Sequence, residues 1–262
     1  MAIKYSLHQD QIDLSNVLLF FALIFIISSQ SLAQIVTDRP DQSEGPTSVG
    51  QNNFQIESGW LNGDFLDDDA TVDIIQFASL FRFGLTDRIE LRIINQWEHL
   101  TTEENLKISG ISDLVLGMKI HLFSLENIGT DIGVVTHISV PSAKMELSAG
   151  KLQSFNRLAV SHNINSDLSV SYNLGIDYLV GNRWVFPYTL TCAKAINEWF
   201  NIYLEAFGQF NQHHVGLNTD AGFTFLLNDN LQFDFSFGLG LSEVMNYTAL
   251  GISWKIEGNS GE

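Results

Sequence analysis

Apolar and polar residues alternate with a period of two along almost the whole chain beyond residue 53. The clearest run is 231–241, LQFDFSFGLGL, in which every second residue is Leu or Phe. Neighbouring side chains of a β-strand point to opposite faces, so such a run has one apolar and one polar face. No helical period of useful length separates the runs, and the pattern predicts an all-β chain. About twelve runs show it, near residues 54–61, 73–83, 89–97, 111–122, 131–140, 155–162, 168–180, 184–192, 199–210, 219–227, 231–241 and 246–256.

The length of these runs favours a membrane barrel over a soluble sandwich. The runs have about 9–12 residues, which is the length of a tilted strand that crosses a bilayer, whereas soluble sheets typically have strands of about 5–6. Their polar faces are rich in Gly and Ser, which suits a crowded lumen. The sequence therefore predicts a transmembrane up-and-down antiparallel β-barrel of about 12 strands, with an exported soluble sandwich as the alternative. Short polar turns alternate with longer segments, the turns at 85–88, 163–167, 193–198 and 228–230 and the longer segments at 62–72, 98–110 and 141–154.

An unbroken apolar run, VLLFFALIFII at 17–27, lies near the N-terminus. A helix needs about 20 apolar residues to span a bilayer, so this run is too short to do so. Small residues follow it and end in Ser31-Leu32-Ala33, as signal peptidase requires. We therefore expect a signal peptide at residues 1–33, with cleavage before Gln34. A buried core helix is the alternative.

Three parts are expected after cleavage. Residues 34–52 are either a plug in the lumen or an arm in the periplasm, residues 53–256 are the barrel, and residues 257–262 are a polar tail. The expected location is the cell outer membrane. The expected partners are outer-membrane lipids and lipopolysaccharide, the outer-membrane assembly machinery, and a small-molecule solute.

The charge balance argues against a nucleic-acid ligand. The chain has 13 basic and 30 acidic residues, a formal net charge of −17, which repels phosphate backbones. Its single cysteine, Cys192, excludes an internal disulfide and a zinc site built from several thiolates.

No residue pattern predicts a metal site or a cofactor. His213 and His214, with Asp220 nearby, could ligate a metal, but a site needs three or four converging ligands. A solvated pair in an outer loop is the better interpretation. Asp67-Asp68-Asp69 could hold a divalent cation, but three consecutive side chains diverge, which favours a solvated loop tip.

No serine and histidine pair predicts a catalytic site either. Ser161 and His162 are neighbours on a strand, so they point to opposite faces and cannot form a dyad. His137 and Ser139 share a face, but no third member of a triad is identified. A barrel hydrolase is therefore the third functional hypothesis.

The charged residues on the polar faces define the expected lumen. Alternation assigns seven acidic and four basic side chains to it. Acidic rings favour cations, so this excess predicts a preference for cations if a path exists. The alternative is that these charges pair across the lumen and fill it. The eleven residues are Glu57, Arg82, Glu90, Arg92, Asp113, Lys119, Asp177, Glu205, Asp220, Asp234 and Lys255.

Proline and tryptophan positions test the barrel. Pro187 lies inside the eighth run, where a closed barrel offers no free edge for a residue without an N–H. Either that strand begins near Tyr188, or the position is a bulge.

The five Trp residues fall near the ends of predicted strands, as an aromatic girdle requires.

The segment after the expected cleavage site resembles a known family. Thr37-Asp38-Arg39-Pro40-Asp41-Gln42, followed by FQIESG at 54–59, resembles the start of a large family of outer-membrane β-barrels named after the meta-pathway of phenol degradation. More generic matches extend the resemblance over about residues 34–256: FGLTDRIELR at 83–92, SGISDL at 109–114, YNLG at 172–175 and DAGFT at 220–224.

The resemblance implies an outer-membrane barrel of Gram-negative type that passes small hydrophobic or aromatic molecules. It brings no catalytic or ligand-binding residues. A passive channel or transporter is therefore the leading functional hypothesis, and a non-transporting structural or surface-interaction barrel is the alternative.

Overall fold

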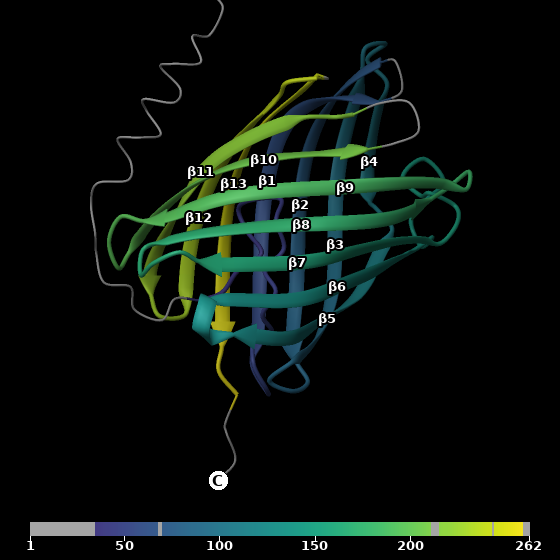
Figure 1. The fold of residues 1–262 in the computed structure, drawn as a ribbon. Helices are drawn as coiled ribbons and strands as arrows, with labels where there is room; N and C mark the ends of the chain where they lie inside the picture. Colours follow the sequence, from purple (N-terminus) through teal and green to yellow (C-terminus); the bar gives the residue numbers. More distant parts are fainter. Residues whose placement is uncertain (1–34, 68–69, 211–214, 243, 259–262) are drawn as a thin grey trace, which may run out of the picture.

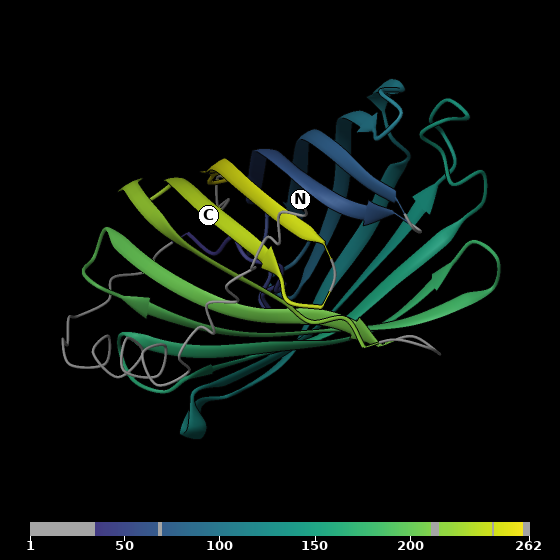
Figure 2. The same cartoon turned by 90° about the horizontal axis from the view of Figure 1, so that it is seen from above.

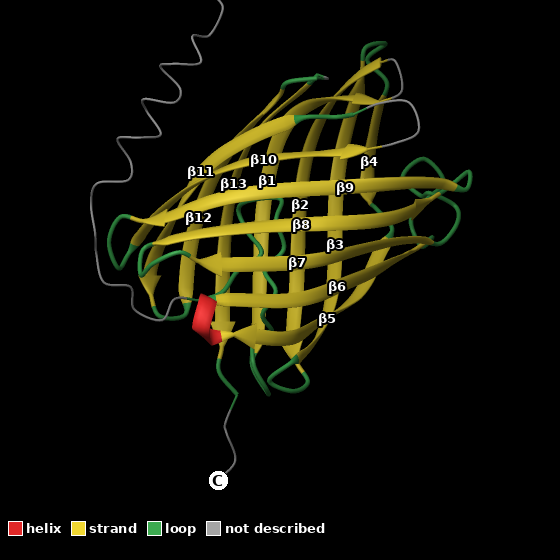
Figure 3. Cartoon of the chain, in the orientation of Figure 1, coloured by secondary structure: helices red, strands yellow, loops and turns green. Residues whose placement is uncertain are grey.

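The computed structural model describes residues 35–67, 70–210, 215–242 and 244–258. Strands make up most of this part of the chain, with a short 3₁₀ turn, η1 (Glu126–Ile128), between two of them (Figure 3). The expected signal peptide, His213 and His214, Asp68 and Asp69, and the end of the polar tail lie outside the described residues. The strands are β1 (Phe54–Asp67), β2 (Ala70–Gly84), β3 (Ile89–Thr102), β4 (Lys107–Ile111), β5 (Leu114–Leu125), β6 (Thr130–Val140), β7 (Gln153–Asn163), β8 (Leu168–Leu179), β9 (Arg183–Ala195), β10 (Phe200–Phe210), β11 (Asn218–Asn228), β12 (Leu231–Gly240) and β13 (Met245–Ile256).

These strands form a closed ring. All neighbouring strands are antiparallel, and β1 pairs with both β2 and β13, which closes the ring (Figures 1 and 2). β4 and β5 both pair with β3, so they are one strand of the wall that is interrupted at Ser112 and Asp113. The wall is therefore a twelve-stranded antiparallel barrel, which confirms the predicted fold class and excludes the sandwich.

The side chains of the barrel are distributed in the opposite way to those of a soluble protein. The largest fully buried side chains are mostly polar or charged, such as Arg82 and Lys119, whereas many large apolar side chains, such as Phe233 and Phe237, are exposed. In β12 the two kinds alternate residue by residue. An apolar outer face and a polar interior are what a lipid-facing barrel requires. Within the described residues, no helix is long and apolar enough to cross a membrane.

Several strands extend further than the alternation predicts. The segments 62–72 and 98–110, expected as loops, are mostly strand: β1 pairs with β2 as far as Asp67, and β3 pairs with β4. Backbone pairing continues there although the apolar pattern stops, because strands outside a bilayer need no apolar outer face. Trp60 and Trp97 consequently lie within β1 and β3 rather than at their ends.

The two ends of the barrel differ in their connections. One end carries the turns 85–88, 126–129, 164–167, 196–199 and 229–230, together with the start of β1 and the end of β13; we call it the short-turn end. The other, the long-loop end, carries the loop 141–152 between β6 and β7 and the tips of the extended hairpins (Figure 1).

Pro187 interrupts one ladder without changing its register. β9 begins at Arg183, before the proline, so the expectation that it starts near Tyr188 is wrong. Its pairing with β8 has a gap between Leu174↔Tyr188 and Asp177↔Val185, and the register is the same on both sides of the gap, so the position is not a bulge. The wall accommodates the missing N–H by losing pairs toward β8, while pairing with β10 continues through Pro187.

We predict that Phe235→Arg destabilises the barrel by about 2–4 kcal/mol, because Phe235 lies midway along β12 on the lipid-facing side. Reversible unfolding in phospholipid vesicles measures the cost. Phe235→Leu is the matched control and should be nearly neutral, and Asp234→Asn on the inner face should be milder than the arginine variant. A larger cost for Asp234→Asn would contradict the assignment of faces.

Candidate functional site

Residues 35–52 run through the lumen of the barrel, and we call this segment the plug. It lies inside the ring of strands (Figure 1), and Ile35 and Val49 near its two ends are both buried. Its backbone N–H groups donate to inward-facing carboxylates of the wall, such as Glu57 and Glu205. Its contacts with the wall fall into two groups, one on β1–β5 and one on β8–β13.

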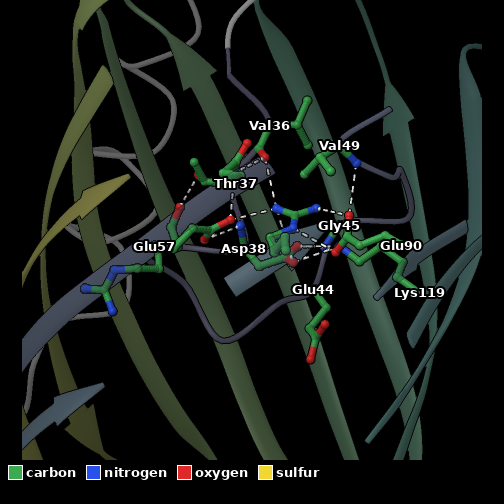
Figure 4. A network of polar contacts seen from close by, with 12 residues as sticks. Val36, Thr37, Asp38, Glu44, Gly45, Val49, Glu57, Glu90 and Lys119 are labelled. Carbon is green, nitrogen blue, oxygen red and sulfur yellow. Dashed lines mark hydrogen bonds and ion pairs between the residues drawn. The ribbon is translucent and has the colours of Figure 1, made fainter. Parts of the chain in front are cut away.

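The first group is centred on the carboxylate of Asp38 (Figure 4). Asp38 Oδ2 lies 2.6 Å from Nη1 of Arg92, 2.8 Å from Nζ of Lys119 and 3.4 Å from Nη1 of Arg82. All three cations come from the wall and are almost completely buried. Burial alone would raise the pKa of Asp38, but the charges of Arg82, Lys119 and Arg92 hold it well below its usual value. The plug therefore supplies a permanent anion to three buried cations.

Two wall carboxylates complete this network. Arg82 Nη1 donates to Glu57 at 2.7 Å, and Arg82 Nε donates to Glu90 at 2.8 Å. The same carboxylates accept backbone N–H groups of the plug, Glu57 from Asp38 at 2.9 Å and Glu90 from Val49 at 2.9 Å. Each carboxylate thus joins a buried arginine to the plug backbone. We call Asp38, Glu57, Glu90, Arg82, Arg92 and Lys119 the ion network.

The second group holds the middle of the plug against the opposite wall. Arg39 pairs with Asp234 at 3.0 Å, and the backbone N–H of Gln42 donates to Glu205 at 2.7 Å. Ser43 Oγ lies 2.7 Å from Oγ1 of Thr191. The backbone of Glu44 makes two hydrogen bonds with the side chain of Asn173. The Glu44 N–H donates to Asn173 Oδ1 at 2.6 Å, and Asn173 Nδ2 donates to the Glu44 carbonyl oxygen at 3.0 Å. These contacts make the plug a docked element of defined register.

A group of carboxyls without a cation lies beside this second group. Glu205 and Asp220 face each other across β10 and β11, and the Tyr247 hydroxyl donates to Asp220. Burial, and then the charges of Glu205 and Asp220, raise the pKa of the plug residue Asp41 well above its usual value. The plug therefore carries two carboxyl groups, Asp38 and Asp41, whose pKa values are shifted in opposite directions.

Most of the eleven predicted lumen residues contact the plug or another charged group. Glu57, Arg82, Glu90, Arg92 and Lys119 form the ion network with Asp38. Glu205 and Asp234 contact the plug directly, and Asp220 lies opposite Glu205. Asp177 is buried and binds Arg157. Lys255 is half-exposed near the short-turn end.

Asp113 has a different position from the other ten. It lies in the break between β4 and β5, where its carboxylate accepts N–H groups of Ser142, Ala143 and Ala149 at 2.9 Å each. Burial would raise the pKa of Asp113, but these hydrogen bonds and that of the Ser148 hydroxyl hold it below its usual value. Asp113 therefore anchors the loop 141–152. Alternation could not reveal this, because the break ends the regular strand.

Sequence reasoning assigned no contacts to the plug residues themselves. The segment 37–42 was notable only as a family resemblance, yet Asp38, Arg39 and Gln42 in it make the ionic and backbone contacts. Glycines on the inner face carry a signal for it. A Cβ at Gly59 or Gly251, which are paired on β1 and β13, would overlap the Arg39 side chain. Small inward residues therefore mark the path of the plug.

Three of the candidate catalytic residues, Ser161, His162 and His137, bond to other groups. Ser161 bonds to Ser171, and His162 lies 2.7 Å from Thr130, so the Ser161–His162 pair is divided between two contacts. Nε2 of His137 accepts from Nε of Arg92 at 3.0 Å. Within the described ranges, no group of three His, Cys, Asp or Glu side chains is arranged to hold a metal ion.

Three cavities follow one another through the lumen beside the plug. A short-turn cavity of about 380 Å³ is lined by Ile35, Tyr203 and the 163–168 turn. A central cavity of about 360 Å³ lies on the other side of the plug. Arg39, Pro40 and Asp41 of the plug line both the short-turn cavity and the central cavity. A long-loop cavity of about 320 Å³ shares Phe65, Phe207 and Met245 with the central one. The plug thus separates the short-turn cavity from the central cavity, which adjoins the long-loop cavity.

We predict that Asp38→Asn weakens docking of the plug by about 3–5 kcal/mol, because it leaves buried cations without their anion. Hydrogen exchange of the plug amides of Gly45 and Val49 measures the effect. Glu44→Gln is the matched control, because Glu44 lies on the same segment but is partly exposed. Of the three buried cations, Glu44 pairs with one, Arg92. Equal protection in Asp38→Asn and in the wild type would contradict the central role of Asp38.

Solved structures share the fold at low sequence identity. An outer membrane channel from Pseudomonas putida F1 has a TM-score of 0.65 and 11% identity, covering 84% of this chain and 100% of that one. The KdgM porin in complex with disordered oligogalacturonate has a TM-score of 0.54 and 10% identity, covering 78% and 99%. The beta domain of the Bordetella autotransporter BrkA has a TM-score of 0.52 and 9% identity, covering 79% and 100%. Barrels with different named roles therefore share this architecture.

Sequence comparison identifies the family. No curated protein sequence matches the chain significantly. A family model described as "Putative MetA-pathway of phenol degradation" matches residues 37–253, which begin at the plug segment that carries the resemblance. Because this match spans most of the chain, the protein belongs to that family.

Proposed function

We propose that this protein is a passive outer-membrane channel for small molecules, closed by its plug in the state described here. The observation that carries the proposal is the row of three cavities, in which Arg39, Pro40 and Asp41 of the plug lie between the short-turn and central cavities. If the plug moves aside, the cavities join into one path through the barrel. The family match and the fold shared with an outer membrane channel support the same function.

Location and partners follow from the outer face of the barrel. Its exposed apolar side chains suit outer-membrane lipids and lipopolysaccharide, and insertion requires export through the signal peptide 1–33 and the outer-membrane assembly machinery. The short-turn end then faces the periplasm, as short turns do in such barrels. Ser161, His162 and His137, which could suggest a hydrolase, bond to other groups, and this favours a channel without catalysis.

The solutes that suit the path are small and hydrophobic or aromatic. The central cavity is lined by apolar side chains of the wall, among them Leu61, Phe65 and Met245. The buried carboxyl groups of Glu205, Asp220 and Asp234 lie on β10, β11 and β12, strands that also contribute residues to the lining of these cavities. Small ions that share the path are therefore expected to be mainly cations.

We predict that a disulfide between the plug and the wall stops conduction. Ser43 and Thr191 have side-chain oxygens 2.7 Å apart, so Ser43→Cys with Thr191→Cys should form a bridge. Cys192→Ser in the same chain removes the native thiol. In planar bilayers, the oxidised double variant should lose most of the wild-type conductance, and dithiothreitol should restore it.

The single variants Ser43→Cys and Thr191→Cys, each with Cys192→Ser, are the matched controls and should not respond to dithiothreitol. Conduction by the oxidised variant at the wild-type level would mean that solutes pass without displacing the plug. A folded barrel that conducts in none of these forms would favour the non-transporting alternative.

We also predict that neutralising lumen carboxylates reduces the preference for cations. Asp177 and Asp234 are both buried on the inner face. Asp177→Asn with Asp234→Asn should shift the reversal potential in a KCl gradient toward that of an unselective channel. Glu126→Gln in the exposed η1 turn is the control and should leave it unchanged. A wild-type preference for anions would contradict the charge argument.

A further inference from the structure

The inner face of the barrel changes character halfway along β1. From the short-turn end, its inward residues are the buried polar Gln55 and Glu57, and beyond Gly59 they become Leu61 and Phe65. β13 runs beside it in the opposite direction and matches the change, since Ala249 pairs with Leu61 and Met245 pairs with Phe65. Phe207 of β10 packs against the same cluster. We call Leu61, Phe65, Phe207, Met245 and Ala249 the apolar patch.

A lumen filled with ion pairs and water gives no reason for such a patch. Apolar surface in contact with water costs about 25 cal/mol per Å² relative to burial. The plug does not cover the patch, because the central cavity of about 360 Å³ lies between them. Pockets that bind small molecules begin at about 300 Å³ and are lined mostly by apolar side chains with a few placed polar groups. The central cavity has that size, and its lining combines the apolar patch with polar side chains such as Gln42, Gln76 and Ser236.

One polar group in this cavity lacks a partner. Ser236 of β12 lines the cavity, is 1% exposed, and its Oγ has no hydrogen-bond partner among the described residues. It is next to Ala249 in the register of β12 and β13. A buried hydroxyl without a partner costs free energy that a ligand can recover by donating or accepting one hydrogen bond.

Two charged groups at the cavity, Arg39 and Asp38, are matched by other charges, and burial together with the charges of Glu205 and Asp220 raises the pKa of the third, Asp41. Arg39 pairs with Asp234, and Asp38 pairs with Arg82, Arg92 and Lys119. An ionised ligand would therefore lose its hydration without gaining a free counter-charge. This favours a neutral ligand.

We propose that the central cavity is a binding site for a small neutral molecule that has a compact apolar body and one hydroxyl. The body rests on the apolar patch, and the hydroxyl bonds to Ser236. The proposal rests on the channel function in that it places the site on the path, directly on the long-loop side of the plug. There it holds a solute before the plug moves.

Fluorine NMR titration of the full-length protein tests the site with two probes, 4-fluorobenzyl alcohol and 4-fluorotoluene, at one fixed detergent concentration. Ala249→Phe should fill the cavity and weaken saturable binding of the alcohol at least about tenfold. Ala221→Phe is the matched control: Ala221 lies on β11 between Leu204 and Phe237, on the outer side of the wall, and should bind like the wild type. Wild-type affinity in Ala249→Phe would overturn the site.

Ser236→Ala tests the role of the hydroxyl. It should weaken binding of 4-fluorobenzyl alcohol about fivefold to tenfold and leave 4-fluorotoluene unchanged, because only the alcohol can bond to Ser236. Equal effects on both probes would overturn the assignment of the hydroxyl.

The disulfide-locked protein separates this inference from the channel function. Binding in the central cavity does not require plug movement, so the oxidised Ser43→Cys, Thr191→Cys variant should bind the alcohol with wild-type affinity. Binding without conductance in any variant would uphold the site and overturn the channel. Conductance without saturable binding would uphold the channel function and overturn the binding site.

Discussion

The pairing of Asp38 with three wall cations is the interaction on which the rest of the interior depends. A lipid-facing barrel places its polar side chains inside, and here Arg82, Arg92 and Lys119 come together on β2, β3 and β5. Glu57 and Glu90 offset part of this charge, and Asp38 offsets the remainder. Removing one partner of a buried ion pair is costly. The stability of the wall and the closure of the lumen therefore rely on the same contacts.

The fold could be predicted from the sequence because one physical requirement extends over the whole wall. Each strand must present apolar side chains to lipid and polar ones to the interior, so LQFDFSFGLGL at 231–241 reveals its own orientation. The requirement ends at the edge of the bilayer. For that reason the hairpin tips of β1–β2 and β3–β4, and the break at Asp113, could not be located by alternation.

The candidate site was predictable in part. Alternation placed Glu57, Arg82 and Glu90 inside, but it gives no information about what they meet there. The plug has no period of its own, and its partners lie far along the chain: Arg39 binds Asp234, 195 residues away. Such contacts depend on closure of the ring. Locally, small inward residues such as Gly59 and Gly251 mark these contacts.

The route of the plug has a mechanical consequence. Ile35 lines a cavity beside the 163–168 turn, and at the other end of the plug the N–H of Gln51 donates to Asp87, so the segment enters and leaves the lumen at the same end of the barrel. A pull on Ile35 from that side would meet the contacts of the plug one after another instead of all together. Contacts loaded in series yield to a smaller force than contacts loaded in parallel. The same plug that resists thermal displacement can therefore be peeled out by tension, without unthreading the chain or opening the wall.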